Sequence, residues 1–339
     1  MKRSLIVSGL LLVGIGGSLG VTKYFIDEEI NEKISLAEPE YKQQAKETYD
    51  DMKAKEKQEK ENAIEKEVSD LNLPKSTGRN KGTFASEYGE TWSLYQNKPT
   101  EVSFLFPLNQ GGFIAGKGRE AFGITLGKDT EESILKKFGN PLTSITKENT
   151  IYQQSKDSAK TVKLYLIEGY YVSFFLDTFN GQKVRSVHYV KKSIENTKDG
   201  YFGSPTDTLR QGFEDSMVEL INQSRAENGL ATLEYDKSLN VVARSHSQDM
   251  VDNNFFSHTG SDGSDAKKRM ENRGFEEHLY AENIAYGQYS SMHAHEALLN
   301  SEGHRANILN KKLTHVGVGV SFRSDGTPMY TINFYTPFS

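Results

Sequence analysis

Histidine is concentrated in one part of this 339-residue chain. Seven of the eight histidines lie between His246 and His315, in a segment that also contains Glu282 and Glu302. A buried imidazole or carboxylate needs a polar partner, so such a cluster indicates a polar site that can bind a cation or move protons. The alternative interpretation is a surface that happens to be rich in histidine.

Several familiar motifs are incomplete in this chain. His295-Glu296 begins a zinc-protease signature, but Leu299 stands where the second histidine would be. Ser257-His258 is no catalytic pair, because adjacent side chains do not aim at each other. The glycines of Gly111–Gly118 lack the lysine, strand and helix of a phosphate-binding loop, so no nucleotide or organic cofactor is expected.

Five short boxes follow one another over about the last 125 residues: His246–Met250 leading to Asn254–His258, Glu282–Ala285, Ser301–Leu309, Val316–Gly319 and Tyr330–Tyr335. In this order they resemble the CAP superfamily, which comprises the cysteine-rich secretory proteins, antigen 5 and the plant pathogenesis-related proteins. The bacterial branch of that superfamily is the most similar.

The resemblance implies an α–β–α sandwich whose cleft holds two histidines and two acidic residues. Position by position, the first histidine corresponds to His258, the first glutamate to Glu282 and the second histidine to His304. Two neutral imidazoles and a carboxylate suit a divalent cation, above all Zn2+, with an open position for water. Without a metal, the same trio can act as an acid–base pair, because the pKa of histidine, about 6.5, moves easily beside a carboxylate.

The fourth position of the cleft has three candidates. Glu302 is the nearest acidic residue, whereas the register of the helix points to Ser301. Glu296 is the alternative if that helix is rotated. The sequence also departs from bacterial relatives at Leu298, where a tryptophan is common, and this leaves the apolar ligand preference of the cleft open.

Residues 1–26 predict an export signal. Met1-Lys2-Arg3 precedes an uncharged, mostly apolar run from Ser4 to Thr22, and basic residues stay on the cytoplasmic side. The run is at the lower limit for crossing a bilayer, and Ser18-Leu-Gly20 offers a cleavage site. Two outcomes stay open: a single-pass membrane anchor with the remaining chain outside the cell, and a secreted protein whose signal peptide is removed.

Residues 27–70 predict a charged stalk that is helical or disordered. They include fifteen acidic and eight basic residues, a net charge of −7 against −5 for the whole chain. Good helix formers with little to bury, as in Lys53–Glu61, favour a solvated stalk over a coiled coil. The mixed charge argues against a nucleic-acid partner, which would require a basic excess.

A linker rich in Gly, Ser, Thr and Asn is expected at residues 71–100, and a first globular domain at residues 101–193. In that domain Asp129 is expected to cap a helix, with Glu132 at the third helical position. The stretch from Leu126 to Pro141 is similar to the domain that often precedes the CAP domain in bacilli and their relatives.

Three runs rich in β-branched and aromatic residues predict a meander of hairpins in the first domain: Val162–Ile167, Tyr170–Leu176 and Val184–Val190. This domain is therefore predicted to be a smaller α+β unit. It contains no catalytic constellation, and His188 is expected to have a structural role in its strand.

A second linker is expected at residues 194–207, with Pro205 as its firmest break, and the C-terminal domain at residues 208–339. Apolar residues at helical spacing predict helices near Phe213–Ser224 and Leu239–Met250. Two further helices are predicted near Asp265–Arg273 and His293–Asn300, and two strands near Val316–Phe322 and Met329–Tyr335. The whole chain is thus predicted to be of the α+β class.

Composition narrows the function. The chain has no cysteine, so disulfides, thiolate chemistry and a lipid-modified cysteine are excluded. Two classes remain: a cell-envelope module that binds a lipid, peptide or cell-wall ligand, and a metal-assisted, peptidase-like hydrolase using the same cleft. The resemblance does not choose between them, because the fold that it implies hosts several roles and many members of the family show no general activity. We favour the binding module.

Overall fold

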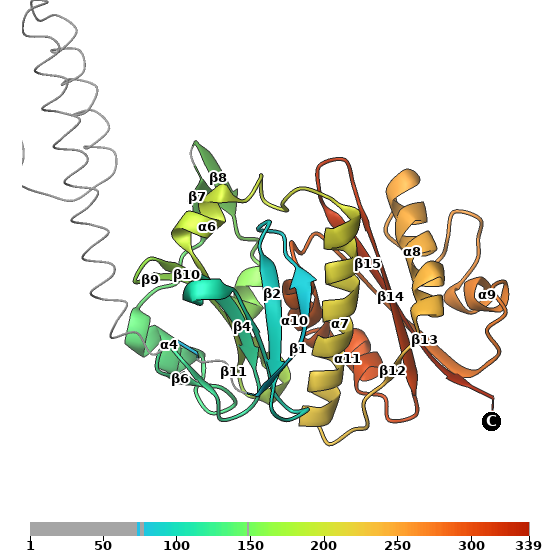
Figure 1. The fold of residues 1–339 in the computed structure, drawn as a ribbon, viewed down its shortest axis with the longest axis horizontal. Coiled ribbons are helices and arrows are strands. Elements are labelled where there is room, and N and C mark those ends of the chain that lie inside the picture. Colours follow the sequence, from blue (N-terminus) through green and yellow to red (C-terminus); the bar gives the residue numbers. More distant parts are fainter. Residues whose placement is uncertain (1–72, 75–77, 148, 339) are drawn as a thin grey trace, which may run out of the picture. The chain divides into compact units, whose positions relative to one another are not determined.

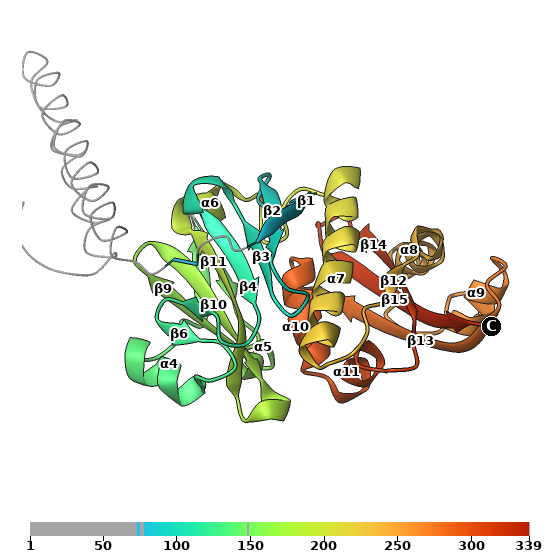
Figure 2. The same ribbon diagram turned by 60° about the horizontal axis from the view of Figure 1, so that its bottom comes forward.

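The computed structural model describes residues 73–74, 78–147 and 149–338. The predicted export signal and the predicted stalk lie outside the described residues. Within the described ranges, no helix is long and apolar enough to cross a membrane. The chain from Asp70 to Ser339 forms one compact unit, in which two domains lie side by side (Figures 1 and 2).

The first domain is built on a seven-stranded antiparallel sheet. Its strands follow the order β1 (Arg79–Ala85), β2 (Thr91–Gln96), β3 (Val102–Leu105), β4 (Gly111–Ala115), β11 (Lys183–Lys191), β10 (Tyr170–Asp177) and β9 (Val162–Ile167). The expected linker at residues 71–100 is wrong, since β1 and β2 lie within it. Its polar composition conceals Trp92 and Leu94, which are two residues apart and buried, as in a strand with one face in a core.

Short elements surround this sheet: β5 (Glu120–Ala121) pairs with β6 (Ile124–Thr125), β7 (Ser144–Lys147) pairs with β8 (Thr150–Gln153), and the helices are α4 (Glu131–Phe138), α5 (Ser158–Thr161) and α6 (Lys192–Thr197). The predicted cap of α4 is wrong by one residue. Thr130 is the N-cap and forms a capping box with Ser133. Asp129 instead accepts a hydrogen bond from the backbone N–H of Thr125 at 2.7 Å, so its carboxylate closes the preceding turn.

The second domain is an α–β–α sandwich, as the resemblance implied. Its sheet has the order β12 (Glu234–Tyr235), β14 (His315–Phe322), β15 (Pro328–Pro337) and β13 (Glu277–Tyr286). One face packs against α8 (Lys237–Asp252) and α9 (Ala266–Glu271), and the other packs against α7 (Asp207–Glu227), α10 (Ser291–Leu299) and α11 (Glu302–Ile308) (Figure 1). Strand β13 forms an edge of this sheet, which places it beside the predicted cleft.

Strand β14 alternates valine and glycine, and the alternation has a packing reason. The valines of Val316–Val320 are buried in the core shared with α7 and α10. On the opposite face, a Cβ at Gly317 would collide with Leu239, and one at Gly319 would collide with the backbone of Ala243 and Arg244. Only glycine lets the backbone of α8 lie this close to the sheet.

Helix α7 stands between the two sheets (Figure 1). Its Leu220 belongs to the apolar core of the first domain, whereas Phe213 and Met217 belong to that of the second. A buried ion pair adds to this contact, because Arg185 of β11 donates from Nε to Oε2 of Glu296 in α10 at 3.1 Å. The two domains therefore share an apolar and charged interface.

Candidate functional site

The three predicted cleft residues come from both sides of the edge strand β13. Glu282 lies in β13, with its side chain on the face covered by α8 and α9. His258 lies in the loop between those two helices, and His304 lies in the first turn of α11, on the opposite face. A site made of these residues must therefore wrap around the edge of the sheet.

His258 and Glu282 form a hydrogen-bonded pair. The Nδ1 atom of His258 lies 2.9 Å from Oε1 of Glu282, and a carboxylate can only accept, so Nδ1 carries the hydrogen. The His258 side chain is 56% exposed, whereas that of Glu282 is 3% exposed. In the neutral ring Nε2 keeps its lone pair, and it has no hydrogen-bond partner among the described residues.

Arg269 of α9 completes this pair, although no sequence motif pointed to it. Its Nη2 donates to Oε2 of Glu282 at 2.7 Å, while its Nη1 donates to the backbone carbonyls of His258 at 3.1 Å and Ser264 at 2.8 Å. The guanidinium compensates the buried carboxylate and fixes the loop that carries His258. A buried carboxylate does predict a cationic partner, but this helix and the turn after it offer four basic residues and no spacing rule chooses among them.

His304 is anchored in a similar way. Its Nδ1 lies 2.7 Å from the hydroxyl of Ser301, and its Nε2 has no hydrogen-bond partner in the described ranges. Burial, and then the nearby charge of His258, lower the pKa of His304, so the two rings lie close enough to influence each other. Asn283 of β13 donates to the backbone carbonyl of His304 at 3.0 Å and thereby ties α11 to the edge strand.

The structure separates the three candidates for the fourth position. Ser301 touches His304 directly. Glu302 is exposed in the first turn of α11. Glu296 is 1% exposed and pairs with Arg185 in the domain interface, so it lies outside the cleft. The residue beside the second histidine is therefore a serine and not an acid.

The arrangement presents two fixed imidazoles. Each ring is held through Nδ1 and presents Nε2, which can serve as a metal ligand or a general base. Glu282 already uses both oxygens, so it orients His258 in the manner of a carboxylate behind a metal-bound histidine. In the part of the chain that the structure describes, no group of three or more His, Cys, Asp or Glu side chains is arranged to hold a metal ion. Cation binding stays a prediction.

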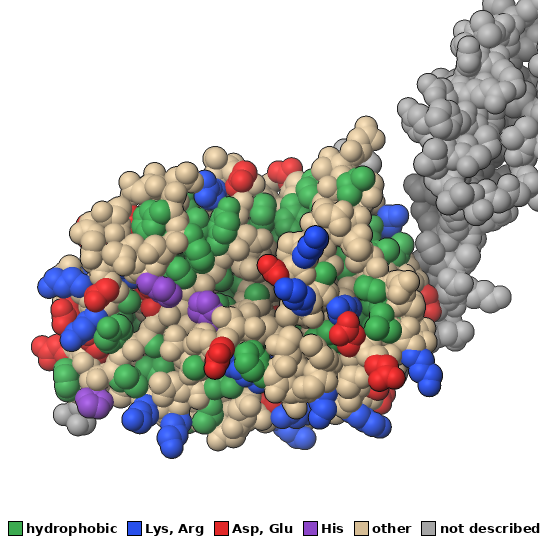
Figure 3. Space-filling view, turned by 180° about the vertical axis from the view of Figure 1, so that it is seen from behind, with side chains coloured by type: hydrophobic (Ala, Val, Ile, Leu, Met, Phe, Trp, Pro, Cys, Tyr) green, Lys and Arg blue, Asp and Glu red, His purple; other side chains and the backbone are tan. Residues whose placement is uncertain are grey.

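An exposed aromatic pair lies next to these residues in the sequence and on the strand. Phe256 precedes His258 by two residues and is 49% exposed; Tyr286 follows Glu282 by four residues in the same strand and is 44% exposed. Their ring centroids are 5.8 Å apart. On the face drawn in Figure 3, histidine side chains reach the surface near apolar and charged side chains. Neighbouring aromatic and imidazole groups of this kind suit a ligand with both apolar and polar parts.

Comparison with known proteins assigns a family to each domain. Residues 218–335 match the CAP, or cysteine-rich secretory protein, family, and residues 64–201 match the CAP-associated N-terminal family. A curated relative from Bacillus subtilis (strain 168), the uncharacterized membrane protein YlbC, is 29% identical over 268 residues, which cover 74% of this chain and 76% of that protein. Uncharacterized protein YkwD of the same strain is 42% identical over 107 residues, which cover 32% of this chain and 42% of that protein.

Two solved structures share the fold. An extracellular protein containing an SCP domain from Bacillus anthracis str. Ames has a TM-score of 0.64 at 24% identity, over 76% of this chain and 88% of that chain. A cysteine-rich secretory protein from Staphylococcus aureus subsp. aureus Mu50 has a TM-score of 0.57 at 16% identity, over 80% of this chain and 89% of that chain.

Proposed function

We propose that this chain is an exported cell-envelope protein that binds an extracellular ligand in the His258–His304 cleft. Its CAP-associated N-terminal domain precedes its CAP domain. The location is supported by the basic and apolar start of the sequence. The printed names of two relatives also support it, one being called a membrane protein and the other an extracellular protein. An uncleaved membrane anchor and a cleaved signal are both compatible with this proposal.

The observation that carries the proposal is the fixed state of Glu282. Arg269 and His258 occupy both of its oxygens, so the carboxylate anchors the ring of His258, while Ser301 holds the ring of His304. Fixed polar groups together with the exposed pair Phe256 and Tyr286 have the composition that binding sites share, namely apolar side chains with a few placed polar groups. A lipid, peptide or cell-wall fragment has the mixed character that fits it.

We further propose that a divalent cation, Zn2+ first, binds the Nε2 atoms of His258 and His304. Imidazole is a good Zn2+ ligand, and a site with two protein ligands leaves positions for a bound ligand or water. When bound, the cation would polarise a carbonyl or phosphoryl group of the ligand. Glu282 and Ser301 would orient the rings.

The test is sedimentation of the full chain with purified cell-wall fragments and with lipid vesicles, with and without Zn2+. We expect the chain to co-sediment with one of them. Replacing Phe256 and Tyr286 with alanine should weaken this co-sedimentation. The matched control is Ile151→Ala, which removes another exposed apolar side chain in the first domain, 66% exposed. Equal binding by the double variant and the control would contradict a ligand in this cleft.

Location has its own test. Protease added to intact cells should release both described domains, because the proposal places them outside the cytoplasm. Full protection of both domains until the cells are lysed would contradict export.

The alternative function, a metal-assisted hydrolase, is favoured by one observation. The Glu282–His258 pair leaves an exposed Nε2 on a ring oriented by a carboxylate, which is the arrangement of a general base. Incubation with peptides and wall fragments in the presence of Zn2+ distinguishes the two functions. Turnover that disappears in His258→Gln would establish the hydrolase, and binding without turnover would support the binding module.

A further inference from the structure

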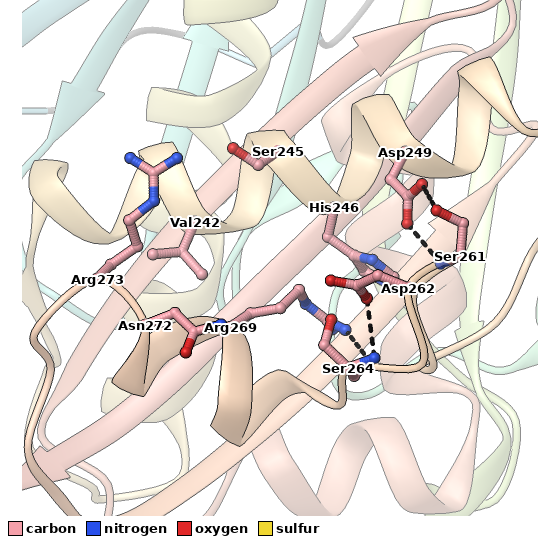
Figure 4. A pocket seen from close by; sticks show the side chains of 10 residues that line it. All are labelled: Val242, Ser245, His246, Asp249, Ser261, Asp262, Ser264, Arg269, Asn272 and Arg273. Carbon is pink, nitrogen blue, oxygen red and sulfur yellow. Dashed lines mark hydrogen bonds between the residues drawn. The ribbon is translucent and has the colours of Figure 1, made fainter.

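A pocket lies beside Arg269, the residue that binds Glu282. It has a volume of about 260 Å³ and lies between α8, α9 and the loop from Ser261 to Ser264 (Figure 4). Its wall includes His246, Asp249, Ser261, Asp262, Arg269 and Arg273, whereas His258, Glu282 and His304 are not part of it. The pocket is thus distinct from the cleft residues, and a ligand in it does not depend on the function proposed above.

His246 contributes an unpartnered acceptor to this pocket. The residue is 1% exposed, and its Nε2 lies 2.9 Å from the backbone carbonyl of Ser257. A carbonyl can only accept, so Nε2 carries the hydrogen and Nδ1 has the lone pair. Burial lowers the pKa of His246, which keeps the ring neutral. Nδ1 is buried without a hydrogen-bond partner in the described residues, and the ring points from α8 toward the Ser261–Ser264 loop (Figure 4).

Arg269 contributes an unpartnered donor. Its two terminal nitrogens donate to Glu282 and to the backbone of His258 and Ser264, while its Nε–H is buried without a partner among the described residues. A buried polar group without a partner destabilises the folded chain. A donor and an acceptor in the wall of one pocket therefore call for a group that satisfies both.

The chemistry of these two atoms selects the ligand. An anion would satisfy Arg269 but would meet the His246 lone pair and the carboxylates of Asp249 and Asp262. An ammonium group would satisfy His246 but would meet the guanidinium groups of Arg269 and Arg273. A hydroxyl group accepts from one atom and donates to the other at once.

We propose that this pocket binds a neutral, hydroxyl-bearing small molecule, a polyol or a single sugar ring, with one hydroxyl between Arg269 Nε and His246 Nδ1. The serines that line the pocket offer further partners for hydroxyl groups. The volume supports a single ring, because it lies below the roughly 300–1,000 Å³ of sites for larger ligands. The experiment must separate a ligand from solvent that fills the pocket.

The experiment is an NMR titration of the full chain labelled with 15N-histidine, using D-glucose, sodium acetate and ethylammonium chloride as probes. The His246 signals are assigned by their loss in His246→Phe. We expect glucose to shift the Nδ1 resonance saturably, with a Kd of roughly 1–10 mM, and the other two probes to leave it unchanged. No shift with glucose up to about 100 mM would mean a water-filled pocket and would overturn the proposal. A shift with acetate or ethylammonium alone would overturn the ligand class.

A variant that fills the pocket tests the proposal without any change to the buried residues. Ser245 is an exposed residue of α8 that lines the pocket, so Ser245→Trp should fill it and weaken glucose binding by about tenfold or more. Val241 is one turn earlier on the same helix, 43% exposed and outside the lining, and Val241→Trp is the matched control. The control should bind glucose within about twofold of the unmodified chain. Equal weakening in both variants, or in neither, would place the bound sugar elsewhere and overturn the proposal.

Discussion

Arg185 Nε lies 3.1 Å from Glu296 Oε2 across the interface of the two domains, and the two side chains are 5% and 1% exposed. The same guanidinium donates to the hydroxyl of Ser224 in α7 and has a carboxylate oxygen of Glu227 3.8 Å from Nη1. One arginine of the first domain thus contacts two helices of the second. The interface is consequently sensitive to the loss of either charge.

Glu296→Leu should lower the free energy of unfolding by about 3–5 kcal/mol, because it leaves the Arg185 guanidinium buried with weaker compensation. The double variant Arg185→Met with Glu296→Leu should recover most of that loss. Urea unfolding measures both. The control is Asp207→Ala, which removes a pair with Arg210 in which the aspartate is 88% exposed, and it should cost no more than about 1 kcal/mol. A double variant as unstable as Glu296→Leu would show that packing, and not the stranded charge, is responsible.

Stability should depend on pH through Glu87, which is 3% exposed and whose carboxyl oxygens have no hydrogen-bond partner in another described residue. Burial raises the pKa of Glu87 from 4.5 to about 8, although Lys198 acts in the opposite direction. Between these values the folded chain holds a proton that the unfolded chain has lost. The free energy of unfolding should therefore fall as pH rises through this range, with the contribution lost above about pH 8.

Glu87→Gln should remove this pH dependence. Relative to the unmodified chain, the variant should gain roughly 3–5 kcal/mol between about pH 5 and pH 9, measured by urea unfolding across that range. Glu90→Gln alters an exposed glutamate nearby and should leave the profile unchanged. Parallel profiles for the unmodified chain and Glu87→Gln would disprove a raised pKa.

His304→Ala should weaken Zn2+ binding by about tenfold or more, because it removes one of two imidazole ligands and little apolar packing. Binding should also weaken as pH falls below about 6, because a protonated imidazole cannot ligate. The lowered pKa of His304 keeps that ring neutral further into this range. Calorimetric titration of the full chain measures both effects. His278→Ala, which removes an exposed histidine of β13, is the control, and equal affinities in the two variants would rule out a shared site.

Gly319→Ala should lower the free energy of unfolding by at least about 3 kcal/mol, because the new Cβ would collide with the backbone of Ala243 and Arg244. Gly303→Ala, in α11, meets no atom within 4 Å and should be neutral or stabilising by up to about 1 kcal/mol. Thermal unfolding of the two variants compares them directly. Similar melting temperatures would contradict the close approach of α8 to β14.

Local sequence determined most of the elements around the site. The three predicted β-rich runs of the first domain and the two predicted strands of the second are strands in the structure, because alternating side chains with one buried face depend on neighbours two residues apart. Other strands were not predicted, among them β2, where polar residues conceal two buried positions, and β13, which carries Glu282. The five boxes predicted His258, Glu282 and His304 as site residues, and the structure pairs two of them, His258 and Glu282.

The partners of these residues depended on tertiary structure. Arg269 binds Glu282 at a sequence separation of 13 residues, and Glu296 binds Arg185 of the other domain at a separation of 111 residues. A helix offers several charged residues at similar spacing, and the face that packs against the sheet decides which one meets the buried carboxylate. Sequence by itself thus determined which groups can do chemistry here, and only the packing of α9, α10 and α11 around β13 decided which of them share a site.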